Sequence, residues 1–496
     1  MIKNFKWLLL VSLTFVACNS DDEPFVDPNS TDGTPLTAGT ADFSKYVALG
    51  NSLTAGYSDS ALFIAGQQGS YPNILASQFA LVGGGEFKLP LMADNTGGLL
   101  LGGTQIAGTR LYFNGSAPAS VPGPPTTDIT NVLSGPFNNM GVPGAKSFHL
   151  LAPGYGNVAG VLSGQANPYF VRFASSPTTT VLADALAQSP TFFSLWIGNN
   201  DVLAYATSGG VGVNQTGNLN PATYGANDIT DPNVFASVYT TLVDQLTANG
   251  AKGVVANLPY VTTIPYFTTV PYNPVALNAT TAAQLNAGYA AYNNGLLFAQ
   301  SNGLLTAAEV ARRTINFSAS STNPVVIVDS YLTNLSGFGI PSYRMATNED
   351  LIVLPARTFI GTTVGGNPAQ VNGVSVPLAD NWVLSKEEIQ EVKAATDAYN
   401  ASIEAIAQAK GLAFVNANVL QTQIANGGIA ANNYTITSAY VTGGGFSLDG
   451  VHPSPRGYAL IANKFLEAIN TTYGSNFKGV NVGLYRILYP LDPANF

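Results

Sequence analysis

The sequence predicts an α/β fold in which a parallel central sheet is covered by helices on both faces. Short apolar runs, typical of strands buried on both sides, recur along the chain, and longer helical segments alternate with them. The 496 residues are 46% hydrophobic and only 9% charged, which indicates a folded, loop-rich protein. That length is compatible with one elaborated α/β domain or with two to three smaller ones.

The first predicted strand covers residues 46–49 and ends at Gly50, and a helix opens after the turn that holds Asn51 and Ser52. Further strands are expected over residues 191–197, 253–258 and 412–417. The expected helices cover residues 181–187, 235–249, 281–301, 385–410 and 454–471. Two segments, near 83–136 and 310–380, interrupt this alternation and are predicted to be insertions.

The first residues have the pattern of an export signal. Lys3 and Lys6 precede an apolar run from Trp7 to Ala17, which is too short to span a bilayer comfortably. The run ends at Cys18, the only cysteine of the chain, and the four residues 15–18 resemble a bacterial lipobox. We therefore expect lipidation at Cys18; the alternative is an ordinary signal peptide followed by an unrelated cysteine.

This interpretation divides the chain into a signal peptide over 1–17, a flexible tether over 18–40 and a folded domain over 41–496. Acidic residues soon after Cys18 are similar to the surface-export signals of some Gram-negative lipoproteins. We therefore expect a lipid anchor in the outer membrane. The sequence does not distinguish its periplasmic face from its outer face. The net charge of −9 argues against a nucleic-acid partner, because the chain has no basic stripe to neutralise phosphates.

Three residues have the chemistry of a hydrolytic triad. Ser52 lies in a tight strand-to-helix turn, where its hydroxyl is presented near a helix N-terminus. Ester hydrolysis at a serine needs a base, for which imidazole is suited, and an acceptor that orients the ring. His452 follows Asp449 by three residues in a chain that has only two histidines. We predict that Ser52, His452 and Asp449 form the catalytic group.

An oxyanion hole needs hydrogen-bond donors aimed at the oxygen of the tetrahedral intermediate. The candidates are the backbone N–H groups of Ser52 and Gly144 and the carboxamide of Asn200. Taken singly, Gly144 is simply a glycine, and Asn200 is equally compatible with a turn.

Four motifs in order resemble the blocks of the SGNH/GDSL esterase–lipase superfamily. They are Gly50-Asn-Ser-Leu53, Asn139-Met-Gly-Val-Pro-Gly144, Gly198-Asn-Asn-Asp201 and Asp449-Gly-Val-His452. The resemblance implies a three-layer α/β/α flavodoxin-like fold and Ser–His–Asp hydrolysis without metal or cofactor. It also places the oxyanion asparagine at Asn200 rather than Asn199. The chain departs from the family at Asn51, where aspartate is usual, and in its two insertions, which we expect to decide the substrate.

Two further features concern the edge of the site. Prolines recur every six residues at 259, 265 and 271, which argues against a central strand or a helix there. Tyr260, Tyr266 and Tyr272 follow them and are candidates for a substrate rim; inward packing in a rigid spacer is the equally open alternative. His149 is expected to have a surface or capping role.

The predicted function is therefore ester hydrolysis, with a lipid, a small acyl ester or an acetylated glycan as substrate. A carbohydrate O-acetyl esterase is the first alternative. A non-catalytic surface lipoprotein that binds a glycan or a partner is the second.

Overall fold

A computed structural model describes residues 26–492 and has a mixed α/β fold around a five-stranded parallel sheet. Its strands are β1 (Tyr46–Gly50), β6 (Asn139–Gly141), β7 (Phe192–Trp196), β8 (Lys252–Ala256) and β17 (Ala413–Val415). They lie in the order β17-β8-β7-β1-β6. The first strand of the chain therefore lies inside the sheet, between β7 and β6, and the second strand, β6, forms the edge. Strands β1 and β7 are buried along their whole length, as their apolar sequences predict.

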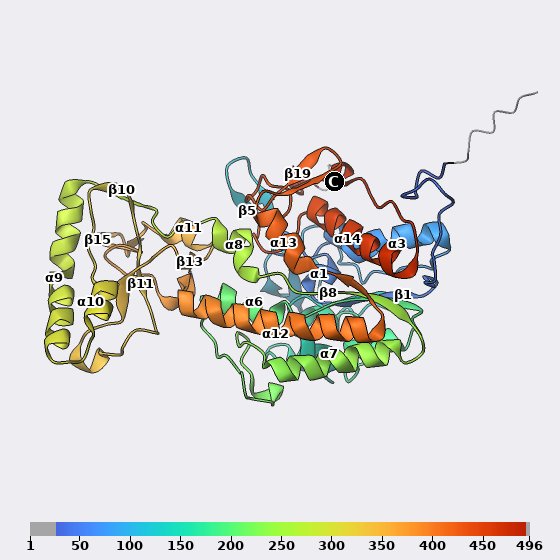
Figure 1. The fold of residues 1–496 in the computed structure, drawn as a ribbon, viewed down its shortest axis with the longest axis horizontal. Helices are drawn as coiled ribbons and strands as arrows, with labels where there is room; N and C mark the ends of the chain where they lie inside the picture. The colour runs from blue at the N-terminus through green and yellow to red at the C-terminus, as the bar shows by residue number, and fades with distance from the viewer. Residues whose placement is uncertain (1–25, 493–496) are drawn as a thin grey trace, which may run out of the picture.

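Helices cover both faces of this sheet (Figure 1). On one face α14 (Pro455–Tyr473) packs against α3 (Tyr71–Phe79), with α13 (Ala417–Ala425) beside them. On the other face α12 (Lys386–Lys410) packs against α7 (Pro232–Thr247) and α6 (Asn200–Thr207). The apolar core lies between these layers, and the helices predicted at 235–249, 385–410 and 454–471 are therefore confirmed.

The first insertion contains two short antiparallel hairpins. Strand β2 (Leu99–Leu101) pairs with β3 (Thr104–Ala107), and β4 (Leu111–Phe113) pairs with β5 (Pro118–Ser120). Strand β6 is not among the strands predicted from the sequence. Its three residues are too few to show the alternation of a strand, yet they pair in parallel with β1.

The second insertion is larger than predicted and forms a lobe at one end of the molecule, which we call the insertion lobe, residues 275–384 (Figure 1). It contains α9 (Ala279–Ser301) and α10 (Ala307–Arg313), which pack together. The helix expected at 281–301 is therefore present but belongs to the lobe. The short strands of the lobe are β9 (Val275–Leu277), β10 (Ser320–Asn323), β11 (Val326–Val328), β12 (Tyr343–Met345), β13 (Leu351–Ile352), β14 (Thr363–Val364), β15 (Asn367–Val371) and β16 (Val383–Leu384).

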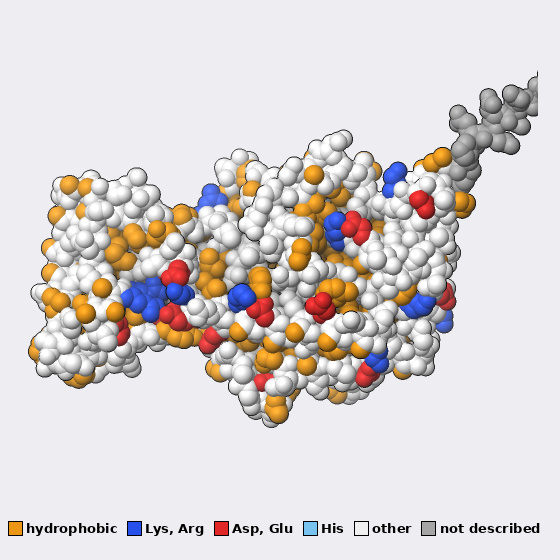
Figure 2. Space-filling view, in the orientation of Figure 1, with side chains coloured by type: hydrophobic (Ala, Val, Ile, Leu, Met, Phe, Trp, Pro, Cys, Tyr) orange, Lys and Arg blue, Asp and Glu red, His pale blue; other side chains and the backbone are white. Residues whose placement is uncertain are grey.

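Ion pairs fasten the insertion lobe internally and to the start of α12. The buried guanidinium of Arg344 contacts Asp329 at 2.5 Å and Asp350 at 2.6 Å. Arg312 then joins Asp329 to Glu387 in the first turn of α12. On the face shown in Figure 2, basic side chains likewise lie beside acidic ones, and charge is sparse.

The described part of the predicted tether is held against the domain. Thr31 N–H donates to the carbonyl of Asn476 at 2.9 Å, and Thr40 N–H donates to that of Tyr473 at 2.8 Å. Thr37 N–H donates to the Asn476 side chain at 2.8 Å. Residues 31–40 therefore run along the end of α14, which differs from the free linker expected there. The signal peptide and Cys18 lie outside the described residues.

None of the helices described between residues 26 and 492 has the length and hydropathy needed to cross a membrane.

Candidate active site

Ser52 lies at the first position of α1 (Ser52–Ala55), directly after strand β1. The side chain of Asn51 caps this short helix by accepting the N–H of Leu53 at 3.0 Å. Gly50 allows the tight turn, because a Cβ there would lie 2.1 Å from Thr54 Oγ1 and 2.4 Å from the carbonyl of Trp196. The turn thus holds the Ser52 side chain at the end of strand β1, as the sequence predicts.

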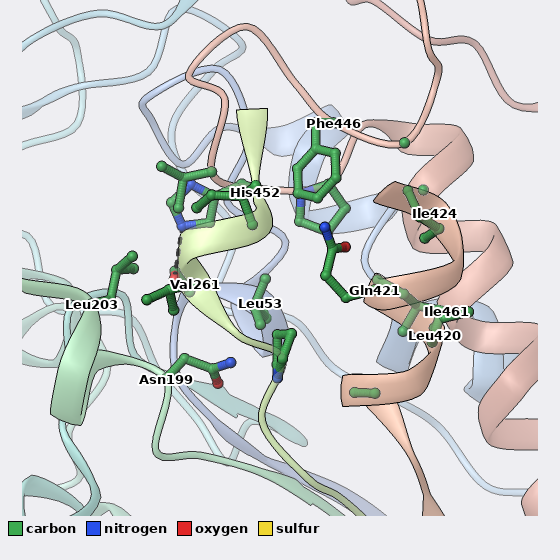
Figure 3. A pocket seen from close by; sticks show the side chains of 18 of the residues that line it. Leu53, Asn199, Leu203, Val261, Leu420, Gln421, Ile424, Phe446, His452 and Ile461 are labelled. Carbon is green, nitrogen blue, oxygen red and sulfur yellow. Dashed lines mark hydrogen bonds between the residues drawn. The ribbon is translucent and has the colours of Figure 1, made fainter. Parts of the chain in front are cut away.

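The structure brings His452 and Asp449 to this serine. His452 Nε2 lies 2.9 Å from Ser52 Oγ, and a dashed line marks this contact in Figure 3. His452 Nδ1 lies 2.9 Å from Asp449 Oδ2. An ionised carboxylate can only accept a hydrogen bond, so it favours the tautomer with Nδ1–H and leaves Nε2 free to accept from the serine hydroxyl. Residues 400 positions apart are therefore in proton-transfer contact.

Asp449 is held in its ionised form. Its Oδ1 accepts the backbone N–H groups of Val451 and His452, each at 2.8 Å. Burial alone would raise the pKa of Asp449, but the charge of His452 and these hydrogen bonds outweigh burial and lower it to about 2. The carboxylate is therefore charged at neutral pH and fixes the orientation of the imidazole.

A second turn, which sequence reasoning missed, supports the Asp449–His452 loop. Ser60 N–H donates to Asp449 Oδ2 at 3.0 Å. Asp59 accepts the N–H of Leu448 at 2.9 Å, and its own N–H donates to Ser447 Oγ at 3.0 Å. Burial raises the pKa of Asp59 to about 7, and the charge of Asp449 acts in the same direction. Asp59 and Ser60 are visible in the sequence as a polar pair. Nothing in the neighbouring sequence, however, indicates that they hydrogen-bond to a loop 389 residues away.

The three proposed oxyanion donors are positioned by separate elements. Ser52 N–H lies at the start of α1, Gly144 follows β6 with a φ of +81°, and Asn200 begins α6. Within residues 26–492, neither the Ser52 nor the Gly144 N–H donates a hydrogen bond to another protein group. Asn200 Nδ2 donates one hydrogen to the carbonyl of Ala145 at 2.9 Å and retains a second.

Two polar residues of the same motifs fix these loops, and sequence reasoning gave them no role. Buried Asp201 accepts the N–H and the hydroxyl of Ser147, at 2.8 Å and 2.7 Å, which ties the segment after Gly144 to α6. Asn139 Nδ2 donates to the carbonyl of Thr54 at 2.8 Å, which ties β6 to α1. Each pair joins the element of one oxyanion donor to that of another.

Ser52 and His452 open into a partly open cavity, which we call the apolar cavity (Figure 3). Asn199 and Asn200 lie on its wall, and the side chains that enclose the remainder are mostly aliphatic. They include Leu53, Leu203, Val261, Ile264, Leu420, Ile424, Phe446 and Ile461.

A second and larger cavity meets the first at Asn200 and Leu203, and we call it the wide cavity. Gly144 and His149 line it, with Lys146, Tyr155 and Tyr224 among the larger side chains. His149 Nδ1 accepts the N–H of Lys146 at 3.0 Å, so the predicted capping role is confirmed. Burial, with the charge of Lys146, lowers the pKa of His149 to about 4.

The segment with the periodic prolines reaches the apolar cavity, but not through its tyrosines. Pro259, Val261 and Ile264 line the cavity. The hydroxyl of Tyr260 instead donates to Asp397 of α12, and Tyr266 donates to the carbonyl of Thr207 at 3.3 Å. Tyr272 packs against the core. The three tyrosines therefore do not form a rim around either cavity, and inward packing describes Tyr266 and Tyr272 better.

The prediction that prolines exclude helices from this segment is also wrong in part. Two short helices, η5 (Val261–Thr263) and α8 (Pro265–Thr268), lie here. Pro265 is tolerated because it occupies the first helical position, where no backbone N–H is needed.

No protein-family model matches the chain, and no curated protein matches it. Among solved structures, an extracellular lipase from Streptomyces rimosus aligns over 86% of this chain and 98% of its own, with 12% sequence identity and a TM-score of 0.27. A TM-score this low carries no argument about function, which must therefore be judged from the geometry of the site.

Proposed function

We propose that the protein is a serine ester hydrolase. The observation that carries this proposal is the continuous chain of contacts from Ser52 Oγ to His452 Nε2 and from His452 Nδ1 to Asp449 Oδ2, both at 2.9 Å. A serine, a histidine and a carboxylate in this arrangement have the roles of nucleophile, general base and orienting group.

In this mechanism His452 Nε2 takes the hydroxyl proton as Ser52 Oγ attacks the ester carbonyl. The carbonyl oxygen gains negative charge, and the N–H groups of Ser52 and Gly144 with the Asn200 carboxamide stabilise it. The intermediate collapses when the bond to the alcohol oxygen breaks and His452 gives that oxygen its proton. Water then attacks the acyl-serine by the same steps and releases the acid and the free Ser52 hydroxyl.

Membership of the SGNH/GDSL superfamily is part of the proposal. In support of it, numbering the five sheet strands along the chain gives the spatial order 2-1-3-4-5, which is that of flavodoxin-like doubly wound sheets. In such sheets ligands bind beyond the carboxyl ends of the strands, which is where Ser52 and Asn200 follow β1 and β7. Asn51 replaces the usual aspartate, and here it serves as a helix cap.

Export and lipid anchoring at Cys18, with attachment to the outer membrane, remain a separate proposal that rests on the N-terminal sequence. Metabolic labelling with an alkyne palmitate is expected to mark the wild type and not Cys18→Ala. Equal labelling of both would contradict lipidation at this residue.

A fluorophosphonate probe tests the proposed hydrolase directly. We expect it to label the wild type and to lose its label in Ser52→Ala, together with p-nitrophenyl acetate hydrolysis. Ser116→Ala, in an exposed hairpin turn, is the matched control and should be labelled normally. A non-catalytic binding protein would remain unlabelled, and labelling that survives Ser52→Ala would remove this serine from the mechanism.

A further inference from the structure

The far wall of the apolar cavity is made by one face of each of two helices. α13 contributes Ala417, Leu420, Gln421 and Ile424, whose spacing of three and four residues places them on a single helical face. α14 contributes Ile461 one turn after Gly457. Figure 3 shows Leu420, Ile424 and Ile461 grouped on the side of the cavity opposite Leu203.

The cavity is also covered by apolar groups near its reactive end. Val261 and Ile264, which are 4% and 5% exposed, lie over it from the proline-rich segment. Phe446 and Val451 flank it beside His452. An ester bound at Ser52 therefore meets aliphatic or aromatic side chains in the directions that lead away from the oxyanion donors.

Polar groups in the cavity are few, and most are already engaged. None of its lining residues is Asp, Glu, Lys or Arg. Asn199 accepts a hydrogen bond from Asn51, and Gln421 donates weakly to the carbonyl of Thr263 at 3.4 Å. A sugar ring placed here would lose the water on its hydroxyl groups without gaining comparable partners, which is costly.

Building on the hydrolase function proposed above, we propose that the apolar cavity binds one aliphatic chain of the substrate. The substrates are then esters with a chain of several methylene groups, and not acetyl groups on a glycan. The chain belongs either to the acid or to the alcohol, since both reactive residues, Ser52 and His452, open into this cavity. The wide cavity, which meets it at Asn200, is left for the other half of the ester.

The test is a chain-length series in two arms, both below the concentrations at which the esters aggregate. The first arm uses p-nitrophenyl esters from acetyl to octanoyl, and the second uses acetate esters of ethanol to octanol, followed by acid release. Each buried methylene is expected to raise kcat/KM by up to about fourfold until the cavity is full. We expect a rise of at least 30-fold along one arm, and the arm that rises identifies the source of the chain.

A pair of variants on α13 locates the effect. Ile424→Trp fills the cavity and should reduce kcat/KM for the longest ester of the responding arm by at least 20-fold. The loss should be smallest for the shortest ester and should grow with each added methylene, because the shortest ester occupies the least of the cavity. Val419→Trp is the matched control, because Val419 lies on the same helix and is 48% exposed; it should leave the whole series unchanged.

The outcomes separate this inference from the proposed function. A wild type that hydrolyses no ester and takes no fluorophosphonate label would overturn the hydrolase function itself. Hydrolysis with flat or falling kcat/KM along both arms, or a preference for acetylated polysaccharide, would overturn the chain-binding cavity and leave the hydrolase intact. The wild-type series decides this alone if Ile424→Trp does not fold.

Discussion

The chain has two histidines, and each lies in its own cavity beside Asn200. At both, Nδ1 makes a hydrogen bond within its own loop, but the partners are opposite in kind. His452 Nδ1 faces the carboxylate of Asp449, whereas His149 Nδ1 accepts the backbone N–H of Lys146. The first arrangement leaves an accepting Nε2 at Ser52; the second makes Nδ1 the acceptor and favours neutral imidazole. Both histidines lie in cavities that Asn200 borders, so this position does not separate them. The hydrogen-bond partner of Nδ1 distinguishes His452, the candidate base, from His149, the structural histidine.

The largest expected effect comes from removing each imidazole in turn. His452→Ala should lower kcat by on the order of 10⁴- to 10⁶-fold, because within residues 26–492 His452 is the one side chain hydrogen-bonded to the Ser52 hydroxyl. His149→Ala should retain activity within about tenfold when it is assayed at pH 7.5 on the same ester. If both variants fold, as judged by circular dichroism, comparable losses of kcat would contradict the assignment of His452 as the base and His149 as a structural residue.

Asn200, which borders both cavities, gives the next effect. Asn200→Ala removes one proposed oxyanion donor and should lower kcat by on the order of 100- to 1000-fold. Asn199→Ala is the matched control, because its carboxamide oxygen is bonded to Asn51, and we expect a loss below tenfold. A fall in kcat of less than about threefold in Asn200→Ala would remove Asn200 from the oxyanion hole. A larger fall in Asn199→Ala than in Asn200→Ala would instead assign the oxyanion donor to Asn199.

The smallest effect concerns stability and pH at His149. Its folded pKa of about 4 lies below the ordinary value of 6.5, so the unfolded chain binds the proton more readily. The folded state should therefore lose stability as pH falls from 6.5 to 4, by about 2–3 kcal/mol for this group alone.

His149→Gln keeps a side-chain acceptor for the Lys146 N–H but cannot be protonated in this range. Urea unfolding at pH 7 and pH 4 should show a smaller pH-dependent loss in this variant than in the wild type. An identical loss in both would mean that His149 is not held neutral by its surroundings.

The sequence predicted most of what depends on local patterns. The turn at Ser52 and the Asp449–His452 loop are each contained in a few residues, and their meeting followed from a parallel sheet with loops at one edge. Strand β6 was missed because three residues carry no periodicity. The helix at 281–301 was recognised, but its pattern does not reveal that it packs within the insertion lobe rather than on the sheet.

The walls of the apolar cavity were harder to predict because they depend on distant partners. Tyr260 resembled a rim residue until its hydroxyl was found to bond Asp397 of α12. Conversely, Leu420 and Ile424 lie on α13, a helix that is not among those predicted from the sequence. The turn at Asp59 and Ser60 supports Asp449 through contacts across nearly the whole chain, which no local motif specifies.

All five strands of the sheet, and Ser52 itself, precede residue 416, whereas Asp449 and His452 come afterwards. During synthesis from the N-terminus, all five sheet strands are therefore made before His452, the proposed base. Any chain shortened at that point carries Ser52 without its proposed base and lacks α14, which packs against β17 and α3. Under the proposed mechanism, turnover of a chromogenic ester therefore reports that the last segment has docked, and its first appearance after refolding times that docking step.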